Sequence, residues 1–243
     1  MAGGVVDRHL DWDGCFNIRD LGGLRTADGR TTRPRAIVRA DGVDRLTAAG
    51  WSALQEYGVR TILDLRNDDE IGSDRDRRPA GVLTVRVPLD DVADAEFWER
   101  CRRDDRDGSP LYYQEFLDRK PERCAAAVAA IARARPGGVV IHCGGGRDRT
   151  GLISLLVLAL VGVVPEDIVS DYELSNARLA PFWAERGVDD QRPLIEEILA
   201  RKNTSARALI FDILASLDAD AYLRAAGLGG DDLAALRARL LGA

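Results

Sequence analysis

The segment between residues 139 and 164 constrains the fold of this chain more than any other. A short apolar run at 139–141 is followed by a glycine-rich stretch at 143–149 and by a long apolar run at 151–164, which Pro165 ends. The first run is typical of a buried strand in a parallel sheet. The second is apolar on every side, as in a helix buried in a protein core, and it is shorter than the ~20 residues that span a bilayer, so we expect no membrane span.

Strand and helix patterns alternate along the rest of the chain. Strands are expected at 36–39, 59–65 and 82–89, and helices at 47–57, 95–103, 112–119 and 121–135. This alternation predicts an α/β fold with a central, mainly parallel sheet flanked by helices. From about residue 165 the pattern is helical, with stretches at 165–178, 193–201, 205–217 and 231–241. The length favours a single domain, residues 1–243, with a helical C-terminal part.

Charge and cysteine content narrow the class of protein. The chain has 34 Lys and Arg against 40 Asp and Glu, a net charge of −6, with no long basic run, so we expect no nucleic-acid partner. Its four cysteines form no C-x-x-C pair and it has only two histidines, which disfavours a zinc site or a disulfide framework. We therefore expect no metal, and a reduced, cytoplasmic environment, since the N-terminus shows no signal-peptide pattern.

The glycine-rich stretch has the composition of an anion-binding loop with a nucleophile at its start. Successive backbone N–H groups of a tight loop converge on an anion, and the N-terminus of the following helix adds partial positive charge. Cys143 stands at the end of the strand, where this field favours its nucleophilic thiolate. Arg149 offers a planar fork for two phosphoryl oxygens. Neither the G-K-[S/T] ending of a nucleotide P-loop nor G-x-G-x-x-G occurs, which excludes these two nucleotide-binding loops.

These residues resemble a known family. Residues 143–150 match the C-x5-R-[S/T] signature of the cysteine-dependent protein tyrosine phosphatase superfamily, and 142–151 are similar to the H-C-x-x-G-K-D-R-T-G loop of its bacterial PtpB-like branch. Residues 17–23 are similar to the N-x-R-D-L-G-G segment of that branch, and 64–66, D-L-R, are a weaker match. The resemblance implies a tyrosine-phosphatase-like fold with a helical C-terminal extension. It also implies phosphomonoester hydrolysis through a phosphocysteine intermediate, without a cofactor.

The resemblance further implies roles for individual residues. Cys143 would attack phosphorus, Arg149 would bind the phosphoryl oxygens, and Thr150 would stabilise the leaving thiolate. The loop residues expected to contact substrate are Gly144, Gly145, Gly146, Arg147 and Asp148. The residues expected to support the loop are His142, Asn17, Arg19 and Asp20.

Two features of the site stay open at the level of sequence. The general acid could be one of several aspartates, namely Asp148, Asp64, and Asp90 or Asp91. Arg147 stands where the family has a lysine, and because a guanidinium is a planar fork rather than a point charge, phosphoinositide activity need not transfer.

Several activities fit this loop. The resemblance favours a protein tyrosine phosphatase, with or without dual specificity, acting on a phosphorylated protein. A phosphatase of a small phosphorylated metabolite or biosynthetic intermediate would use the same mechanism. The intact Cys143, Arg149 and Thr150 argue against a non-catalytic phosphate-binding module, since a module that only binds phosphate does not need a nucleophile. Arsenate reduction would need Cys101 or Cys124 as a resolving cysteine.

The charged segment 91–108 is expected to form a surface insertion or a lid.

Overall fold

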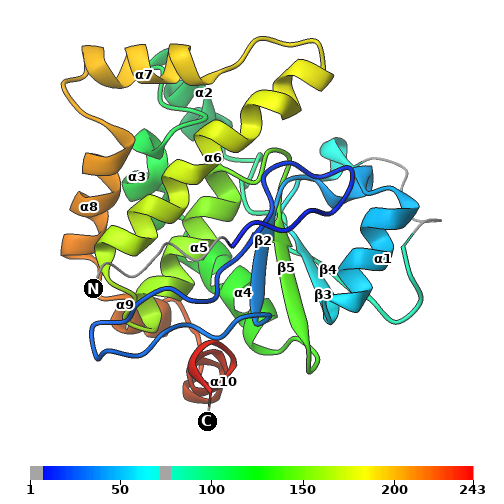
Figure 1. Ribbon diagram of the computed structural model, residues 1–243. Helices are drawn as coiled ribbons and strands as arrows, with labels where there is room; N and C mark the ends of the chain where they lie inside the picture. Colours follow the sequence, from blue (N-terminus) through cyan, green and yellow to red (C-terminus); the bar gives the residue numbers. More distant parts are fainter. Residues whose placement is uncertain (1–7, 72–77, 243) are drawn as a thin grey trace, which may run out of the picture.

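The computed structural model describes residues 8–71 and 78–242 of the chain (Figure 1). They contain a five-stranded sheet of order β1-β2-β5-β3-β4. The strands are β1 (Arg19–Asp20), β2 (Ile37–Ala40), β3 (Val59–Asp64), β4 (Leu83–Arg86) and β5 (Gly138–His142). Only β1 pairs antiparallel, with β2, and the other neighbours are parallel. The expected α/β fold with a mainly parallel sheet is confirmed.

The central strand β5 is buried along its whole length because helices cover both faces of the sheet. Side chains alternate between the faces, so Val139 and Ile141 enter the larger core and Val140 the smaller one. Helices α4 (Pro121–Ala132) and α5 (Asp148–Leu160) line the larger core, and α1 (Ala48–Glu56) lines the smaller. Figure 1 shows α4 and α5 on one side of the sheet and α1 on the other.

The remaining helices extend the layer formed by α4 and α5. They are α2 (Ala95–Arg103), α3 (Tyr113–Arg119), α6 (Pro165–Glu185), α7 (Arg192–Arg201), α8 (Ala206–Ser216), α9 (Ala219–Ala225) and α10 (Gly230–Leu241). Short 3-10 turns occur at η1 (Val43–Arg45), η2 (Asp68–Glu70) and η4 (Pro110–Tyr112). Side chains of α8, α9 and α10 enter the same core as α4 and α5. The helical C-terminal part therefore shares one core with the helices that cover the sheet.

The sequence located most of these elements, with differences at their ends. Helix α5 starts at Asp148 rather than at 151 and stops at Leu160, shortly before Gly162, whose φ of 74° is left-handed. Strand β4 is shorter than 82–89, and α6 continues past residue 178 through Pro181 to Glu185. Strand β1 and helix α9 were not expected. Among the described residues, no helix is both long and apolar enough to cross a membrane.

Candidate active site

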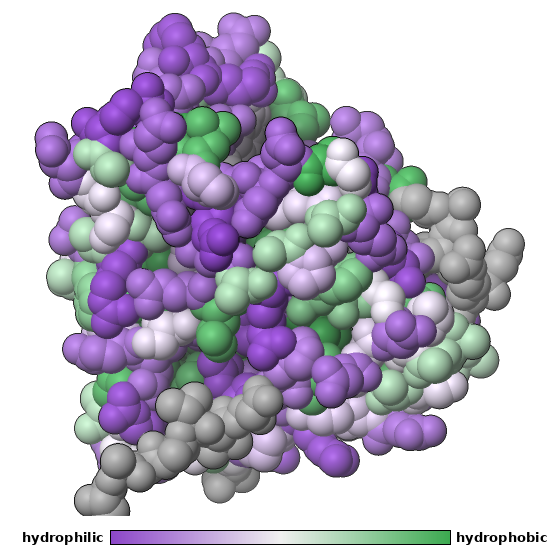
Figure 2. All heavy atoms as spheres, turned by 45° about the horizontal axis from the view of Figure 1, so that its top comes forward, coloured by the Kyte–Doolittle hydropathy of each residue, from purple (hydrophilic) through white to green (hydrophobic). Residues whose placement is uncertain are grey.

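The glycine-rich loop lies at the carboxyl edge of the sheet, where open α/β folds bind ligands. Strand β5 ends at His142, Cys143 follows it with 3% of its surface exposed, and α5 begins five residues later at Asp148. The N-terminus of α5 is thus directed at the loop and supplies partial positive charge there. Figure 2 brings forward the top of Figure 1, and the face it shows is mainly hydrophilic with smaller hydrophobic areas.

Gly146 allows the loop to lie against the end of β2. Its φ of 67° is left-handed, and a Cβ at this position would lie 2.3 Å from the carbonyl oxygen of Ala40. Backbone atoms cannot move aside as a side chain can, so a residue other than glycine would displace the loop. A second close contact joins the same segments, since the Gly42 N–H donates to the Gly144 carbonyl at 2.9 Å.

Side chains behind the loop bind the next two carbonyls. The Asn17 Nδ2 donates to the Gly145 carbonyl at 2.9 Å, and the Arg39 Nη2 donates to the Gly146 carbonyl at 2.8 Å. In a planar trans peptide the C=O and the following N–H point in opposite directions. The N–H groups that follow these carbonyls, including that of Arg147, therefore point away from Asn17 and Arg39, toward the inner side of the loop. The arrangement can bind the oxygens of a tetrahedral oxyanion.

Arg149, in the first turn of α5, is paired with two carboxylates. Its Nη2 lies 2.6 Å from Glu70 Oε1, its Nη1 also contacts Glu70, and Nη1 lies 2.9 Å from Asp90 Oδ2. Burial opposes the charge of Arg149, but the Glu70 hydrogen bonds and the charges of Cys143 and Asp90 outweigh it and raise its pKa. Arg149 therefore stays protonated and positively charged next to Cys143.

Glu70 was not singled out by sequence reasoning. Its Oε2 accepts a 2.9 Å hydrogen bond from the backbone N–H of Asn67, which fixes the turn η2, and Asn67 Nδ2 donates to Asp90 at 3.1 Å. The spacing of Asn67 and Glu70 is that of a capping box and is a signal that could have located this turn.

The aspartates that were candidates for the general acid lie in different surroundings. Asp90 is half-buried next to Arg149, and burial raises its pKa while the charge of Arg149 opposes the shift. The Asp91 carboxylate forms ion pairs with Lys120 at 2.8 Å and with Arg123 at 2.6 Å rather than with Arg149.

Asp64 is part of a buried ion pair behind the loop. Both of its oxygens accept from Arg66 at 3.0 Å. Burial would raise the pKa of Asp64, but the hydrogen bonds from Arg66 outweigh burial and lower it. His142 lies 3.6 Å from the same carboxylate, and its Nδ1 is 3.2 Å from the Cys143 carbonyl. The ring is fully buried, and this burial lowers its pKa to about 4.

Asp148 and Arg147 interact mainly with each other and with the helices around the loop. The Asp148 carboxylate lies 3.2 Å from Arg147 Nη2 and 3.5 Å from the Tyr172 hydroxyl, and the Tyr113 hydroxyl donates to the Asp148 carbonyl at 2.8 Å. Arg147 is buried and also donates to the Gly108 carbonyl at 2.8 Å. Its guanidinium therefore holds the segment before η4 against the loop, and its expected contact with substrate stays a prediction.

Neither the Thr150 hydroxyl nor the Asp20 carboxylate forms a hydrogen bond with the glycine-rich loop, within the residues that the structure describes. The Thr150 hydroxyl is buried, and within the part of the chain that the structure describes it has no hydrogen-bond partner. Asp20 accepts from the N–H of Gly22 at 2.8 Å and of Arg35 at 2.6 Å, so it shapes the turn after β1 rather than the loop itself.

Asp41 supports the loop indirectly and was not expected. Its carboxylate accepts from the N–H of Phe16 at 3.1 Å and of Asn17 at 3.0 Å. Burial raises the pKa of Asp41 to about 6, although both N–H groups oppose the shift. It fixes the segment that carries Asn17 to the end of β2.

A C-x5-R loop at the carboxyl edge of a mainly parallel sheet is the arrangement expected of a cysteine-dependent phosphatase. Residues 10–242 match the model of the tyrosine phosphatase family, and the chain belongs to this family. Among the described residues, no group of three or more His, Cys, Asp or Glu side chains is arranged to hold a metal ion.

Several individual proteins are similar to this chain over most of its length. A protein of Cupriavidus necator named as a tyrosine-protein phosphatase is 32% identical over 186 residues, 74% of this chain and 68% of the relative. The triple specificity protein phosphatase PtpB of Mycobacterium tuberculosis is 28% identical over 242 residues, 88% of this chain and 85% of PtpB. A crystal structure of P. aeruginosa TpbA with pTyr matches 82% of this chain and 91% of TpbA, with 18% identity and a TM-score of 0.38. The resemblance to the PtpB-like branch is confirmed, and the protein is a cysteine-dependent phosphatase that acts on phosphorylated substrates.

Proposed function

We propose that this protein hydrolyses phosphotyrosine in proteins, with Cys143 as the nucleophile and Arg149 and the loop N–H groups as the phosphoryl-binding groups. One observation carries this assignment. The carbonyls of three successive loop residues accept hydrogen bonds from Gly42, Asn17 and Arg39, which lie outside the loop. The loop N–H groups that follow these carbonyls can then bind the oxygens of a phosphoryl group next to Cys143. The names of the relatives, tyrosine-protein phosphatase and triple specificity protein phosphatase, support the substrate class.

The reaction has two steps on this loop. The Cys143 thiolate attacks phosphorus, the bond to the phenolic oxygen breaks, and that oxygen takes a proton from a general acid. Water then attacks phosphorus and gives a proton to the carboxylate that the general acid left behind, the bond to sulfur breaks, and inorganic phosphate and the thiolate are released. In both steps the equatorial oxygens carry developing charge, which the loop N–H groups and Arg149 stabilise. Because Arg149 contacts Glu70, the phosphoryl group competes with this carboxylate for the guanidinium N–H groups.

Asp90 is our assignment for the general acid. A general acid must be protonated near the working pH and lie close to the leaving group. Asp90 meets the first condition better than Asp64, because burial raises the pKa of Asp90 while Arg66 lowers that of Asp64. It meets the second better than Asp91, which is turned toward Lys120. Its contact with Arg149 places it at the edge of the phosphoryl site.

The nucleophile is tested by phosphate release from an aryl phosphate, with EDTA present, by the wild type and by Cys143→Ser. The matched control is Cys124→Ser, the same change at a buried cysteine in α4. We expect activity to be lost only in Cys143→Ser. Full activity in Cys143→Ser would contradict the assignment.

The substrate class is tested with a panel of phosphotyrosine peptides, phosphoserine peptides, phosphoinositides and sugar phosphates. A preference for a sugar phosphate would contradict the proposal of a protein substrate.

The general acid is tested by the pH dependence of kcat. Asp90→Asn is expected to lower kcat by ~10²- to 10⁴-fold for a poor leaving group, less for a good one, and to remove the alkaline limb of the profile. Asp64→Asn and Asp91→Asn are expected to keep that limb. If Asp64→Asn or Asp148→Asn removes it and Asp90→Asn does not, the proton comes from that residue instead.

A further inference from the structure

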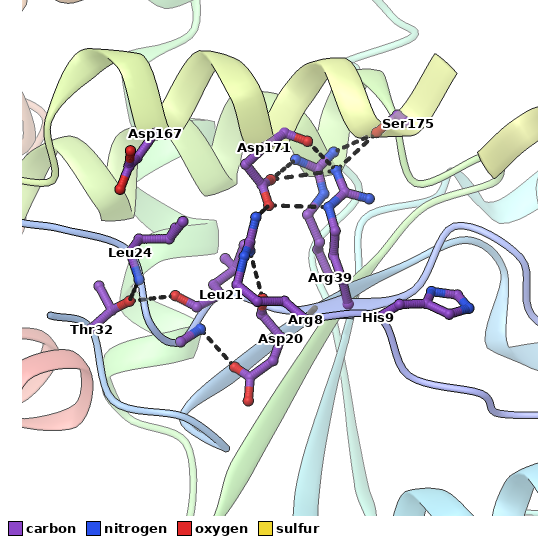
Figure 3. A network of polar contacts seen from close by, with 12 residues as sticks. Arg8, His9, Asp20, Leu21, Leu24, Thr32, Arg39, Asp167, Asp171 and Ser175 are labelled. Carbon is purple, nitrogen blue, oxygen red and sulfur yellow. Dashed lines mark hydrogen bonds and ion pairs between the residues drawn. The ribbon is translucent and has the colours of Figure 1, made fainter. Parts of the chain in front are cut away.

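A single buried carboxylate on α6, that of Asp171, pairs with three arginines from the N-terminal part of the chain, and Figure 3 labels two of them, Arg8 and Arg39. Asp171 Oδ1 lies 2.8 Å from Arg8 Nη2 and 3.0 Å from Arg19 Nε, and its Oδ2 lies 2.7 Å from Arg39 Nη1. The side chains of Asp171, Arg19 and Arg39 are each 1% exposed. Ser175, one turn further along α6, accepts from Arg19 Nη2 at 3.0 Å. Charges buried to this degree are costly unless they are paired and hydrogen-bonded.

Two connections lead from this carboxylate to the phosphate-binding loop. Arg39 binds Asp171 through Nη1 and the Gly146 carbonyl through Nη2. Arg19 binds Asp171 through Nε and donates from Nη1 to Asn17 Oδ1 at 2.6 Å, and the Asn17 amide donates to the Gly145 carbonyl. The side chains that fix two successive loop carbonyls are thus both oriented by Asp171, directly or through one residue.

The charge of Asp171 is required for this arrangement. Three guanidinium groups converge on it, and like charges in a buried cluster repel strongly when the carboxylate between them is lost. Burial and the charge of Arg39 lower the pKa of Arg19 to about 9, although Asp171 opposes the shift. The pKa of Asp171 is held well below its usual range, because the three arginines outweigh its burial.

We propose that Asp171 is the positioning residue of the phosphate-binding loop, which it orients through Arg39 and through Arg19 and Asn17. The proposal rests on the proposed function, since it concerns the same loop, and it assigns to α6 a part in binding the phosphoryl group. Asp171 does not touch the substrate. It fixes the direction of the loop N–H groups, and a misplacement of about 1 Å at such donors can cost ~10²-fold in rate.

The test compares Asp171→Asn with Asp167→Asn. Asp167 lies one turn earlier on the same helix and pairs with Arg25, whose side chain is 69% exposed, so the control makes the same chemical change outside the buried cluster. The measurements are kcat/KM for an aryl phosphate, the Kd for inorganic phosphate, and Tm. We expect Asp171→Asn to lose ~10²-fold in kcat/KM and to bind phosphate more weakly per folded molecule, and Asp167→Asn to keep both values.

A double-variant cycle separates positioning from a general loss of stability. If Asp171 acts partly through Asn17, the double variant Asp171→Asn with Asn17→Ala loses less in kcat/KM than the product of the two single fold-losses. Additive losses would overturn the proposal, and so would a lowered Tm with unchanged phosphate Kd. If Asp171→Asn does not fold, Asn17→Ala and Arg39→Lys are decisive. Each removes one link between Asp171 and a loop carbonyl, and an unchanged phosphate Kd in both variants would overturn the proposal.

The two proposals can fail independently. Full activity in Cys143→Ser would contradict the proposed function. Wild-type kinetics in Asp171→Asn, together with an inactive Cys143→Ser, would contradict the positioning role alone.

Discussion

The buried histidine before the nucleophile gives a quantitative prediction for stability against pH. His142 is fully buried, and burial lowers its pKa from 6.5 to about 4, with Asp64 partly opposing the shift. In the unfolded chain the ring takes up a proton below pH 6.5, whereas in the folded chain it stays neutral until the pH falls to about 4. The unfolded state therefore binds more protons between these values, and stability falls as the pH is lowered.

The size of the effect follows from the two pKa values. At ~1.36 kcal/mol per pKa unit the full loss is ~3 kcal/mol once the pH lies below both values. At pH 5 the unfolded ring is almost fully protonated and the folded ring almost fully neutral, which gives a loss of ~2 kcal/mol relative to pH 7.5. This is a large fraction of the ~5–15 kcal/mol that stabilises a typical domain.

The measurement is urea unfolding of the wild type and of His142→Gln at pH 7.5 and pH 5. The wild type is expected to lose ~2 kcal/mol more than the variant between the two conditions, because only the wild type carries this titration. His9→Gln makes the same change at the other histidine of the sequence, whose side chain is 21% exposed. Equal losses in the wild type and His142→Gln would refute the reasoning, and so would a loss that His9→Gln reduces and His142→Gln does not.

Three further predictions concern the loop and its surroundings. Gly146→Ala places a Cβ 2.3 Å from the Ala40 carbonyl oxygen, so kcat/KM for an aryl phosphate is expected to fall by more than ~10²-fold, and activity near the wild-type value would show that the loop can shift without cost. Asp64→Asn breaks a buried ion pair with Arg66 and is expected to lower the free energy of unfolding by ~3 kcal/mol at pH 7, measured with urea. Phosphate release is expected to be the same with and without EDTA, because loop N–H groups and Arg149 provide the charge stabilisation, and inhibition by EDTA would contradict this.

The sequence predicted the parts of the site that depend on local pattern. The strand, loop and helix around Cys143 follow from an apolar run, consecutive glycines and a second apolar run that are adjacent in the chain. Helix α2 was predicted at its observed bounds. In the structure the Asp94 side chain accepts a hydrogen bond from the Phe97 N–H, so a local N-cap marks the start of this helix. Such signals need no knowledge of distant residues.

The residues that sequence reasoning missed depend on contacts between distant segments. Arg39 and Asp171 are 132 positions apart, and Glu70 and Arg149 are 79 positions apart. An arginine in a strand or an aspartate on a helix has no local pattern that distinguishes a buried ion pair from an exposed side chain. Strand β1 has two residues and is defined by its pairing with β2 and by a bridge to His9, so no periodicity could reveal it.

The burial of the charged groups separates those that shape the loop from those that the substrate can displace. Behind the loop, Arg39 and Asp171 are each 1% exposed. In front of it, Arg149, Glu70 and Asp90 are 15%, 31% and 16% exposed. A phosphoryl group can therefore exchange with Glu70 at Arg149 while the groups behind the loop stay in place. Substitutions behind the loop should weaken phosphate binding equally for all substrates, because they change the oxyanion site. A substitution at Asp90 should depend on the leaving group, because it changes only the transfer of its proton.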